Sequence, residues 1–261
     1  MNQPLAYIHP GAKISKNVVV EPFTTIHNNV TIGDGTWIGS NVTIMEGARI
    51  GKNCNIFPGA VISAPPQDLK YKGEDTTVSI GNGTTVRECA TIHKGTSDRN
   101  KTVIGKNCLI MAYCHVAHDC LVGDNCIFSN NSTLAGHVTI GSNVILAGLV
   151  AVHQFVSVGQ HAFVTGGSLV RKDVPPFVKA AREPLSYVGI NSVGLRRRGF
   201  QSEKIREIQN IYRILYQKHY NNTQATQIIE AEMEATPERD EILQFIRDSQ
   251  RGIMKGYFSN N

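Results

Sequence analysis

An aliphatic residue returns at every sixth position over most of this chain. Steps of six from Ile8 to Val170 meet only Ile, Val, Leu or Phe, apart from Asp68, Glu74 and Asp98. A period of six fits neither the 3.6-residue turn of an α-helix nor the two-residue alternation of a long strand. It is the signature of a parallel β-helix built from hexapeptides, whose aliphatic residues point into one continuous core. A β-sandwich would instead show a period of two.

A second position of the hexapeptide keeps the same register. The residue two places before each aliphatic one is usually small, as at Ala6, Ala12, Thr24 and Ala48, and lets the backbone turn a tight corner beside the axis. Glycine often follows the aliphatic residue, as in I-G-D-G-T, where a turn can require positive φ. The register ends after Val170, because the prolines of D-V-P-P-F cannot donate ladder hydrogen bonds.

Beyond this segment the pattern becomes helical. Apolar residues at helical spacing predict three helices, one capped by Ser202, one by Thr223 and one opened by Thr236 before a proline. We therefore expect two domains, a β-helix over residues 1–190 and a small helical domain over residues 191–261.

The three register breaks indicate loops that leave the coil, because an aspartate in an aliphatic slot would bury an unpaired charge. The first excursion is expected over about 63–79 and the second over about 93–103. The six-residue phase is kept across both, so the coil should resume as if uninterrupted. Long loops on a repetitive scaffold usually carry function.

Composition excludes several classes of protein. With 261 residues and 41% hydrophobic content the chain can bury a sizeable core. It has no apolar run of about 20 residues and its first residues lack a secretory pattern, so we expect a cytoplasmic protein without a membrane span. The six cysteines form no C-x-x-C pair, which argues against a disulfide framework or a zinc ribbon. A net charge of +5 is too small to indicate nucleic-acid binding.

The stretch Y-C-H-V-A-H-D-C, residues 113–120, has the composition of a metal site, but the register divides it. Cys114 and Cys120 occupy the small corner slot and should point inward as fillers, together with Cys108 and Cys126. They are therefore poor zinc ligands. The outward part of the hexapeptide holds His115, His118 and Asp119.

Stacking then places other polar residues beside His118. If three hexapeptides make one coil, residues 18 apart lie above one another, about 4.8 Å apart. His118 is then followed on the next coils by Gly136 and Gln154, and Asp119 by His137. His153 precedes Gln154 on the same edge.

This edge suits acyl transfer. A neutral histidine can take the proton of a hydroxyl that attacks a carbonyl, and a neighbouring carboxylate fixes its tautomer. A glycine lets a backbone N–H approach the oxyanion closely. The sequence has no G-x-S-x-G elbow and no cysteine expected at the surface, which favours direct transfer over a covalent acyl-enzyme.

Several motifs occur together in a fixed order: P-Q-D-L-K-Y, T-I-H-K-G-T, H-V-A-H-D-C, T-L-A-G-H-V, V-H-Q-F, D-V-P-P and G-L-R-R-R-G-F. In these motifs the whole chain resembles the acyl-[acyl-carrier-protein]–UDP-N-acetylglucosamine O-acyltransferases of lipid A biosynthesis. The resemblance implies a left-handed β-helix of triangular section and a homotrimer with active sites between subunits. It also implies transfer of an (R)-3-hydroxyacyl group to the 3-position of UDP-N-acetylglucosamine. No cofactor or metal is implied, because the acyl group arrives on the phosphopantetheine of acyl carrier protein.

The resemblance also suggests roles for individual residues. His118 would be the general base, Asp119 its orienting acid and Gly136 the oxyanion donor. The substrate-binding residues would be Asp68, Lys70, His93, His115, His137, His153, Gln154, Asn191 and Arg197, and the carrier protein would dock on Arg196, Arg197, Arg198, Lys204 and Arg206.

Some alternatives stay open at this point. Val193 stands where several family members carry an acidic residue, which leaves room for an acceptor with a 3-amino group. The distal end of the acyl groove would lie near Phe163 to Ser168, where Gly166 gives space, but the chain length cannot be derived from this. A zinc-dependent enzyme would use histidines among His93, His115, His118 and His137. The related N-acyltransferase of the pathway carries an extra N-terminal domain for which the repeats leave no room, and a scaffold without activity would bind no ligand at this edge.

Overall fold

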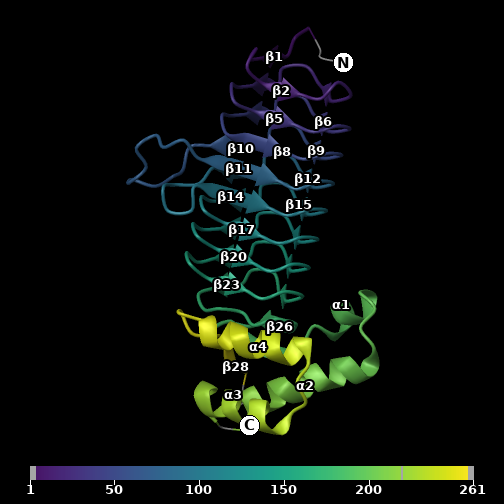
Figure 1. The fold of residues 1–261 in the computed structure, drawn as a ribbon, viewed down its shortest axis with the longest axis vertical. Coiled ribbons are helices and arrows are strands. Elements are labelled where there is room, and N and C mark those ends of the chain that lie inside the picture. Colours follow the sequence, from purple (N-terminus) through teal and green to yellow (C-terminus); the bar gives the residue numbers. More distant parts are fainter. Residues whose placement is uncertain (1–3, 219, 258–261) are drawn as a thin grey trace.

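The computed structural model describes residues 4–218 and 220–257, and these form a parallel β-helix followed by a helical region (Figure 1). The coil has three flat sides, and each side is a parallel sheet with strands of mostly two residues. The predicted fold class is therefore confirmed.

The strands follow one another around the coil from sheet 1 to sheet 2 to sheet 3. Sheet 1 contains β1 (Tyr7–Ile8), β4 (Thr25–Ile26), β7 (Thr43–Ile44), β10 (Val61–Ala64), β13 (Thr91–His93), β16 (His115–Val116), β19 (Thr133–Leu134), β22 (Ala151–Val152) and β25 (Leu169–Val170). Sheet 2 contains β2 (Lys13–Ile14), β5 (Thr31–Ile32), β8 (Ala48–Ile50), β11 (Thr77–Ile80), β14 (Lys101–Ile104), β17 (Leu121–Val122), β20 (Thr139–Ile140) and β23 (Ser157–Val158).

Sheet 3 begins with short strands of the same kind and ends in the region that carries the helices. It contains β3 (Val19–Val20), β6 (Trp37–Ile38), β9 (Asn55–Ile56), β12 (Thr85–Val86), β15 (Leu109–Ile110), β18 (Ile127–Phe128), β21 (Ile145–Leu146), β24 (Phe163–Val164), β26 (Val178–Ala181), β27 (Ser186–Ile190) and β28 (Lys255–Gly256). The antiparallel pair β26–β27 ends the parallel stacking.

The aliphatic residue of each hexapeptide forms the core, as predicted. Ile26, Ile44, Val116 and Leu134 are all completely buried, and each pairs with the aliphatic residue of the next coil in its sheet. Each short strand therefore contributes one side chain to a column that runs along the axis, which explains why so short a repeat forms a stable core.

The three register breaks lie in two loops that leave the same corner of the coil. Residues 65–76 connect β10 to β11, and residues 94–100 connect β13 to β14. Strand pairing continues across them in phase, with Ile62 opposite Ile92 and Ile80 opposite Ile104. The loops are shorter than expected, because β10, β11 and β14 have four residues each, whereas most strands of the coil have two.

The helical region contains one more helix than predicted. Its helices are α1 (Ser192–Arg197), α2 (Ser202–Gln217), α3 (Asn222–Glu232) and α4 (Pro237–Asp248). Thr236 caps α4 as expected, with its hydroxyl accepting from the Arg239 amide at 3.3 Å. The other two predicted caps are wrong, because α2 starts after Gln201 and α3 starts after Asn221, whose side chain forms a capping box.

The helical region is tied to the last coils of the β-helix. The Tyr212 hydroxyl donates to the carbonyl of Pro176 at 2.6 Å, and β28 returns to pair with β27. The division at residue 190 stays a prediction, and the outer ends of the two predicted domains, residues 1–3 and 258–261, lie outside the described residues. Among the described helices, none combines the length and apolar character that a membrane crossing needs.

Candidate active site

The corner that leads from sheet 1 to sheet 2 is here called the site edge. It carries both excursions and, on the following three coils, His118–Asp119, Gly136–His137 and Gln154–Phe155. The register of β16, β19 and β22 aligns His115 with Thr133 and Thr133 with Ala151, so the predicted stacking by 18 residues is confirmed.

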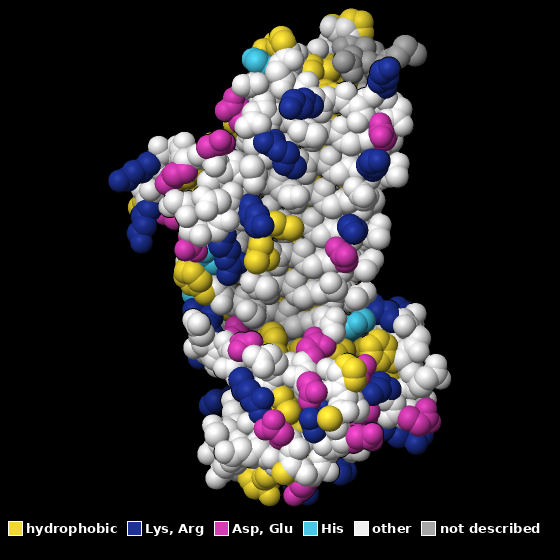
Figure 2. Space-filling model, in the orientation of Figure 1, with side chains coloured by type: hydrophobic (Ala, Val, Ile, Leu, Met, Phe, Trp, Pro, Cys, Tyr) yellow, Lys and Arg dark blue, Asp and Glu magenta, His cyan; other side chains and the backbone are white. Residues whose placement is uncertain are grey.

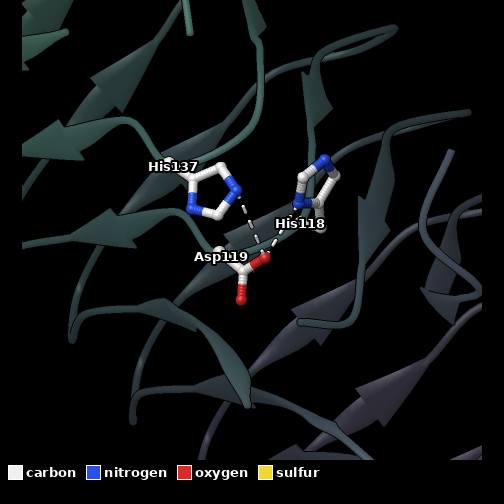
Figure 3. Close-up of side chains that lie close together, drawn as sticks. All are labelled: His118, Asp119 and His137. Carbon is white, nitrogen blue, oxygen red and sulfur yellow. Dashed lines mark hydrogen bonds and ion pairs between the residues drawn. The ribbon is translucent and has the colours of Figure 1, made fainter. Parts of the chain in front are cut away.

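His118 and Asp119 form a hydrogen-bonded pair (Figure 3). The Nδ1 atom of His118 lies 2.8 Å from Oδ2 of Asp119. The carboxylate is ionised when it accepts this bond, which assigns the proton to Nδ1 and leaves Nε2 as the basic nitrogen. This is the arrangement that a general base requires.

The prediction that this pair faces outward is only half right. Both side chains point away from the core, but the second excursion covers them, so that His118 is 6% exposed and Asp119 is 0% exposed. Thr96 donates its hydroxyl to Asp119 Oδ2 at 2.6 Å, and the Arg99 amide donates to Oδ1 at 3.2 Å. Burial by itself raises the pKa of Asp119, but the hydrogen bonds from Thr96 and His118 outweigh it and hold that pKa below its ordinary value.

Gly136 has to be a glycine because of the His118 ring. A Cβ atom at this position would lie 2.6 Å from Cε1 and Nε2 of His118. In the described part of the chain, no acceptor is paired with the Gly136 N–H. The glycine therefore brings a free backbone donor next to the basic nitrogen.

His137 lies on the other side of Asp119 (Figure 3). Its Nε2 is 3.8 Å from Asp119 Oδ2, and its Nδ1 is 3.0 Å from Oδ2 of Asp98 in the second excursion. The ring meets His118 edge-on with centroids 5.0 Å apart and stacks on Phe155 at 4.6 Å. Burial lowers the pKa of His137, which favours a neutral ring despite the two carboxylates.

A second pair of histidines lies in sheet 1 beside the site edge, with His115 on the same coil as His118 and His93 on the preceding coil. His115 Nδ1 is 2.7 Å from the Thr91 hydroxyl, and its ring meets His93 edge-on at 4.8 Å. Burial, together with the charges of His115 and His118, lowers the pKa of His93 to about 4, so His93 is neutral near pH 7.

A hollow of about 870 Å³ opens at the site edge. Of the predicted site residues it is lined by Asp68, Lys70, His115, His118, Gly136, His137 and Gln154. Leu69 and Lys70, at the tip of the first excursion, are exposed, and Figure 2 shows basic side chains at the end of this projection. A hollow of this size accommodates a drug-sized or nucleotide-sized ligand.

Other predicted residues do not reach this hollow within one chain. His93 is buried behind His115, and His153 is exposed with its Nδ1 turned to the carbonyl of Gln154 at 3.0 Å. Asn191 and Arg197 lie at α1, on the opposite side of the β-helix from the excursions (Figure 1). The Asn191 side chain is occupied there, because it donates to the His161 carbonyl at 2.9 Å and caps α1.

The predicted basic docking residues lie at α1 and the start of α2. Arg196, Arg197 and Arg206 are exposed, whereas Lys204 forms ion pairs with Glu207 and Glu238 at 2.9 and 3.0 Å. Val193 is 58% exposed on α1.

The inward direction of the four stacked cysteines is confirmed, since Cys108, Cys114, Cys120 and Cys126 are all buried. Burial raises the pKa of Cys114 to about 11 and that of Cys120 to about 12, so neither is a thiolate near pH 7. The expectation that no cysteine is exposed is wrong for Cys89, which lies at the corner between sheet 3 and sheet 1 and does not line the hollow.

Within residues 4–218 and 220–257, one group of side chains has donor atoms close enough to hold a metal ion. Atoms of His118, Asp119 and His137 lie within 4.8 Å of one another. The Asp119 oxygen in this group already accepts from Thr96 and His118, and the Arg99 guanidinium donates to the Asp119 carbonyl at 2.8 Å. A nearby guanidinium disfavours a divalent cation, so the geometry suits a metal-free base better.

Comparison with known proteins identifies the family. Residues 29–64 and 101–136 match the model of the bacterial transferase hexapeptide, and residues 173–254 match the second domain of UDP N-acetylglucosamine O-acyltransferase. The acyl-[acyl-carrier-protein]–UDP-N-acetylglucosamine O-acyltransferase of Trichlorobacter lovleyi is 48% identical over 96% of this chain and 98% of its own length. That of Halorhodospira halophila is 42% identical over 97% and 98%. The chain belongs to this family.

Solved structures agree with this assignment. A UDP-N-acetylglucosamine acyltransferase from Bacteroides fragilis is 49% identical, with a TM-score of 0.96 over 98% of this chain and 100% of that one. One from Francisella novicida is 40% identical, with a TM-score of 0.96 over 100% and 95%. The chain is therefore a hexapeptide-repeat acyltransferase of lipid A biosynthesis.

Several residues of the site were not predicted for this acyltransferase. Thr96, Asp98 and Arg99 hold Asp119 and His137 from the second excursion, and Phe155 stacks on His137. A signal was present for Phe155, because it occupies the corner slot of Asp119 and His137. The loop residues gave none, since an excursion has no period that assigns a direction to its side chains.

Proposed function

We propose that this chain transfers an (R)-3-hydroxyacyl group from acyl carrier protein to the 3-hydroxyl of UDP-N-acetylglucosamine, the first step of lipid A biosynthesis, in the cytoplasm. The observation that carries the proposal is the His118–Asp119 pair, 2.8 Å apart, with the Gly136 backbone against its imidazole and a large hollow in front of it.

The proposed reaction is a single displacement. Nε2 of His118 takes the proton of the sugar 3-hydroxyl while that oxygen attacks the thioester carbon. The N–H of Gly136 stabilises the resulting oxyanion. The carbon–sulfur bond then breaks, and the imidazolium returns its proton to the phosphopantetheine thiolate. A covalent acyl-enzyme on cysteine is disfavoured, because Cys114 and Cys120 face the core with raised pKa values.

The hollow supplies polar groups for the acceptor. We assign Asp68 and Lys70 of the first excursion, with His115, His137 and Gln154 of the site edge, to the sugar and the acyl chain. Asp68 Oδ1 accepts from the Lys70 amide at 2.9 Å, which holds the tip of the excursion in a turn and leaves Oδ2 available for a sugar hydroxyl.

We also propose that the protein acts as a homotrimer. Asn191 and Arg197, proposed to contact the nucleotide, lie across the β-helix from the His118 hollow, so one chain cannot bring both to one substrate. In the proposed trimer these residues, with His153, come from a neighbouring subunit. Analytical ultracentrifugation that finds a monomer at assay concentration would contradict this.

The proposed carrier-docking surface consists of Arg196, Arg197, Arg198 and Arg206, and Lys204 contributes less because two glutamates neutralise it. Arg206→Glu should raise KM for the acyl carrier protein substrate at low salt and leave KM for the sugar nucleotide unchanged. Equal changes in both constants would remove this surface as the docking site.

The test of the function is a mass-spectrometric assay of the purified chain. It combines UDP-N-acetylglucosamine or its 3-amino analogue with carrier proteins bearing 3-hydroxyacyl groups of increasing length. We expect an O-acyl product, and His118→Ala should lower turnover by about 10³-fold with unchanged circular dichroism. Turnover by His118→Ala near that of the wild type would exclude it as the base. A preference for the 3-amino acceptor would instead support the alternative that the exposed Val193 leaves open.

The zinc-dependent alternative is supported by the group of His118, Asp119 and His137. Elemental analysis of the purified protein separates the two mechanisms. Stoichiometric zinc with activity lost on chelation would replace the metal-free base, whereas full activity in chelator supports it.

A further inference from the structure

The second excursion, residues 94–100, closes over the carboxylate of Asp119. The Thr96 amide donates to both carboxylate oxygens, at 3.0 and 3.1 Å, and the Arg99 amide donates to Oδ1 at 3.2 Å. Because Asp119 is completely buried, no water replaces any of these donors. The position of the carboxylate therefore depends on a loop that does not belong to the repeat.

The Thr96 hydroxyl has a fixed direction. It accepts a hydrogen bond from the Asp98 amide at 3.3 Å, so its own proton is free to point to Asp119 Oδ2, 2.6 Å away. Oδ2 is also the oxygen that accepts from His118 Nδ1. The Thr96 hydroxyl and the His118 imidazole therefore both donate to Asp119 Oδ2. The bond from the hydroxyl is charge-assisted and ends on the oxygen that orients His118.

The same loop reaches the second imidazole of the site. Asp98 Oδ2 lies 3.0 Å from His137 Nδ1, two residues after Thr96. The loop therefore contacts both Asp119 and His137. The rings of His118 and His137 lie with their centroids 5.0 Å apart.

We propose that Thr96 is a positioning residue for the reaction: its hydroxyl fixes Asp119 Oδ2 against His118 and so holds the base in the tautomer with a free Nε2. This rests on the proposed role of His118 as the base. Thr96 touches neither reacting atom in this role, and its effect reaches the chemistry through Asp119 and His118.

Thr96→Val tests the role with little change in the volume of the side chain. Valine keeps the branched shape and the backbone amide that donates to Asp119, but it lacks the hydroxyl. We expect kcat to fall about tenfold, the effect of losing one charge-assisted hydrogen bond, with KM for the sugar nucleotide changed less than about twofold. Without the hydroxyl the carboxylate is more basic and holds the imidazolium more tightly, so the acid limb of the kcat/KM profile should move to higher pH. Thr96→Ser should restore both.

Thr36→Val is the matched control. The Thr36 hydroxyl is buried in the same way, donates to the Gly51 carbonyl at 2.9 Å and accepts from the Cys54 amide at 3.1 Å, but it lies on the N-terminal coils away from the hollow. It should lower the melting temperature and leave kcat and the acid limb unchanged. A Thr96→Val variant that keeps wild-type kcat and pH profile, or that changes only its melting temperature as Thr36→Val does, would overturn the proposal.

A magnetic resonance measurement separates this proposal from the assigned reaction. In protein with nitrogen-labelled histidine, the His118 Nδ1 proton should give a downfield signal that His118→Ala removes. Thr96→Val should shift or broaden this signal and Thr96→Ser should retain it, with no substrate present. If the wild type fails to acylate UDP-N-acetylglucosamine but the signal responds, only the proposed function fails; if transfer proceeds and the signal ignores Thr96→Val, only the positioning role fails.

Discussion

The corner residues of the site edge differ in type before and after the two excursions, although they share a backbone conformation. The corner residue has positive φ on both stretches, with Asn29 at 53° and Gly47 at 88° before the excursions and Asp119 at 59°, His137 at 63° and Phe155 at 65° after them. Asparagine and glycine are the residues that adopt this conformation most easily. Phenylalanine is strained in this conformation. The later coils therefore carry backbone strain at positions whose side chains face the hollow.

The contrast teaches where function can be placed on a repetitive fold. At Asn29 the side chain has a structural contact, since its Oδ1 accepts from the Arg49 guanidinium of the next coil at 2.7 Å. At Asp119 the side chain is held by a neighbouring loop and in turn holds the His118 ring. The predictions below compare positions that are equivalent in the repeat but lie on different edges or on different coils of the site edge.

The largest effect is expected from glycines at one repeat position. In Gly136→Ala the new Cβ would lie 2.6 Å from the His118 ring and displace the base, so kcat should fall by at least about 10²-fold. In Gly148→Ala, at the same position on another edge, the Cβ would meet only the Asn130 carbonyl at 3.5 Å. Steady-state assays should therefore find Gly148→Ala close to wild type, and similar losses in both variants would contradict the special role of Gly136.

Asp119→Asn should reduce activity less than His118→Ala, by about 10²-fold, because it removes the carboxylate that selects the His118 tautomer but leaves the imidazole in place. Its amide would also present hydrogens to the donors of Thr96 and Arg99 in a buried site, so the melting temperature should fall. Single-turnover kinetics, with thermal unfolding followed in parallel, measure the two effects separately. Loss of activity as complete as in His118→Ala would give Asp119 a larger role than orientation.

His161 occupies the same corner slot, with φ of 59°, on the edge between sheets 2 and 3. Burial, with a smaller contribution from Arg198, lowers its pKa from 6.5 to about 4 in the folded protein. Between these values the unfolded chain binds a proton that the folded chain does not, so stability is lost as the pH falls through this window. The loss should be about 2 kcal/mol at pH 4.5.

His161→Asn removes this titration and keeps a residue that tolerates positive φ. Urea unfolding at pH 7 and 4.5 should show a smaller loss of stability for this variant than for the wild type. If the free energy of unfolding fell between pH 7 and 4.5 by the same amount as in the wild type, His161 would be protonated in the folded state.

The smallest effect is expected at Asn29, before the excursions. Asn29→Ala should cost about 1 kcal/mol, because alanine is strained at positive φ and the contact with the Arg49 side chain is lost. Asn29→Gly should cost less. Both variants should retain wild-type kcat, and a change in kcat would show that this part of the edge is not purely structural.

The repeat explains why much of the molecule could be predicted. The aliphatic phase fixed the core, the direction of Cys114 and Cys120, and the neighbours of His118, since each follows from counting in steps of six or 18. Burial of Asp119 could not be predicted, because its cover comes from a loop with no period. The helix caps were displaced by one or two residues. At α3, Asn221 forms the cap in place of Thr223, whereas at α2 the N-cap Gln201 forms no side-chain cap hydrogen bond, so the sequence carries no cap signal there.

Because the coil resumes in phase after each excursion, the residues around the hollow of this enzyme fall into two sets, those placed by the coil and those placed by the loops. Strand pairing in the coil sets the spacing between His118 and Gly136, and this spacing does not depend on the length of the loops. The first excursion adds Asp68 and Lys70 to the lining of the hollow, and it can lengthen, shorten or change residues without moving the scaffold. A change in the first excursion can thus alter the lining of the hollow alone, whereas a change in the second also reaches His118, because Thr96 holds Asp119.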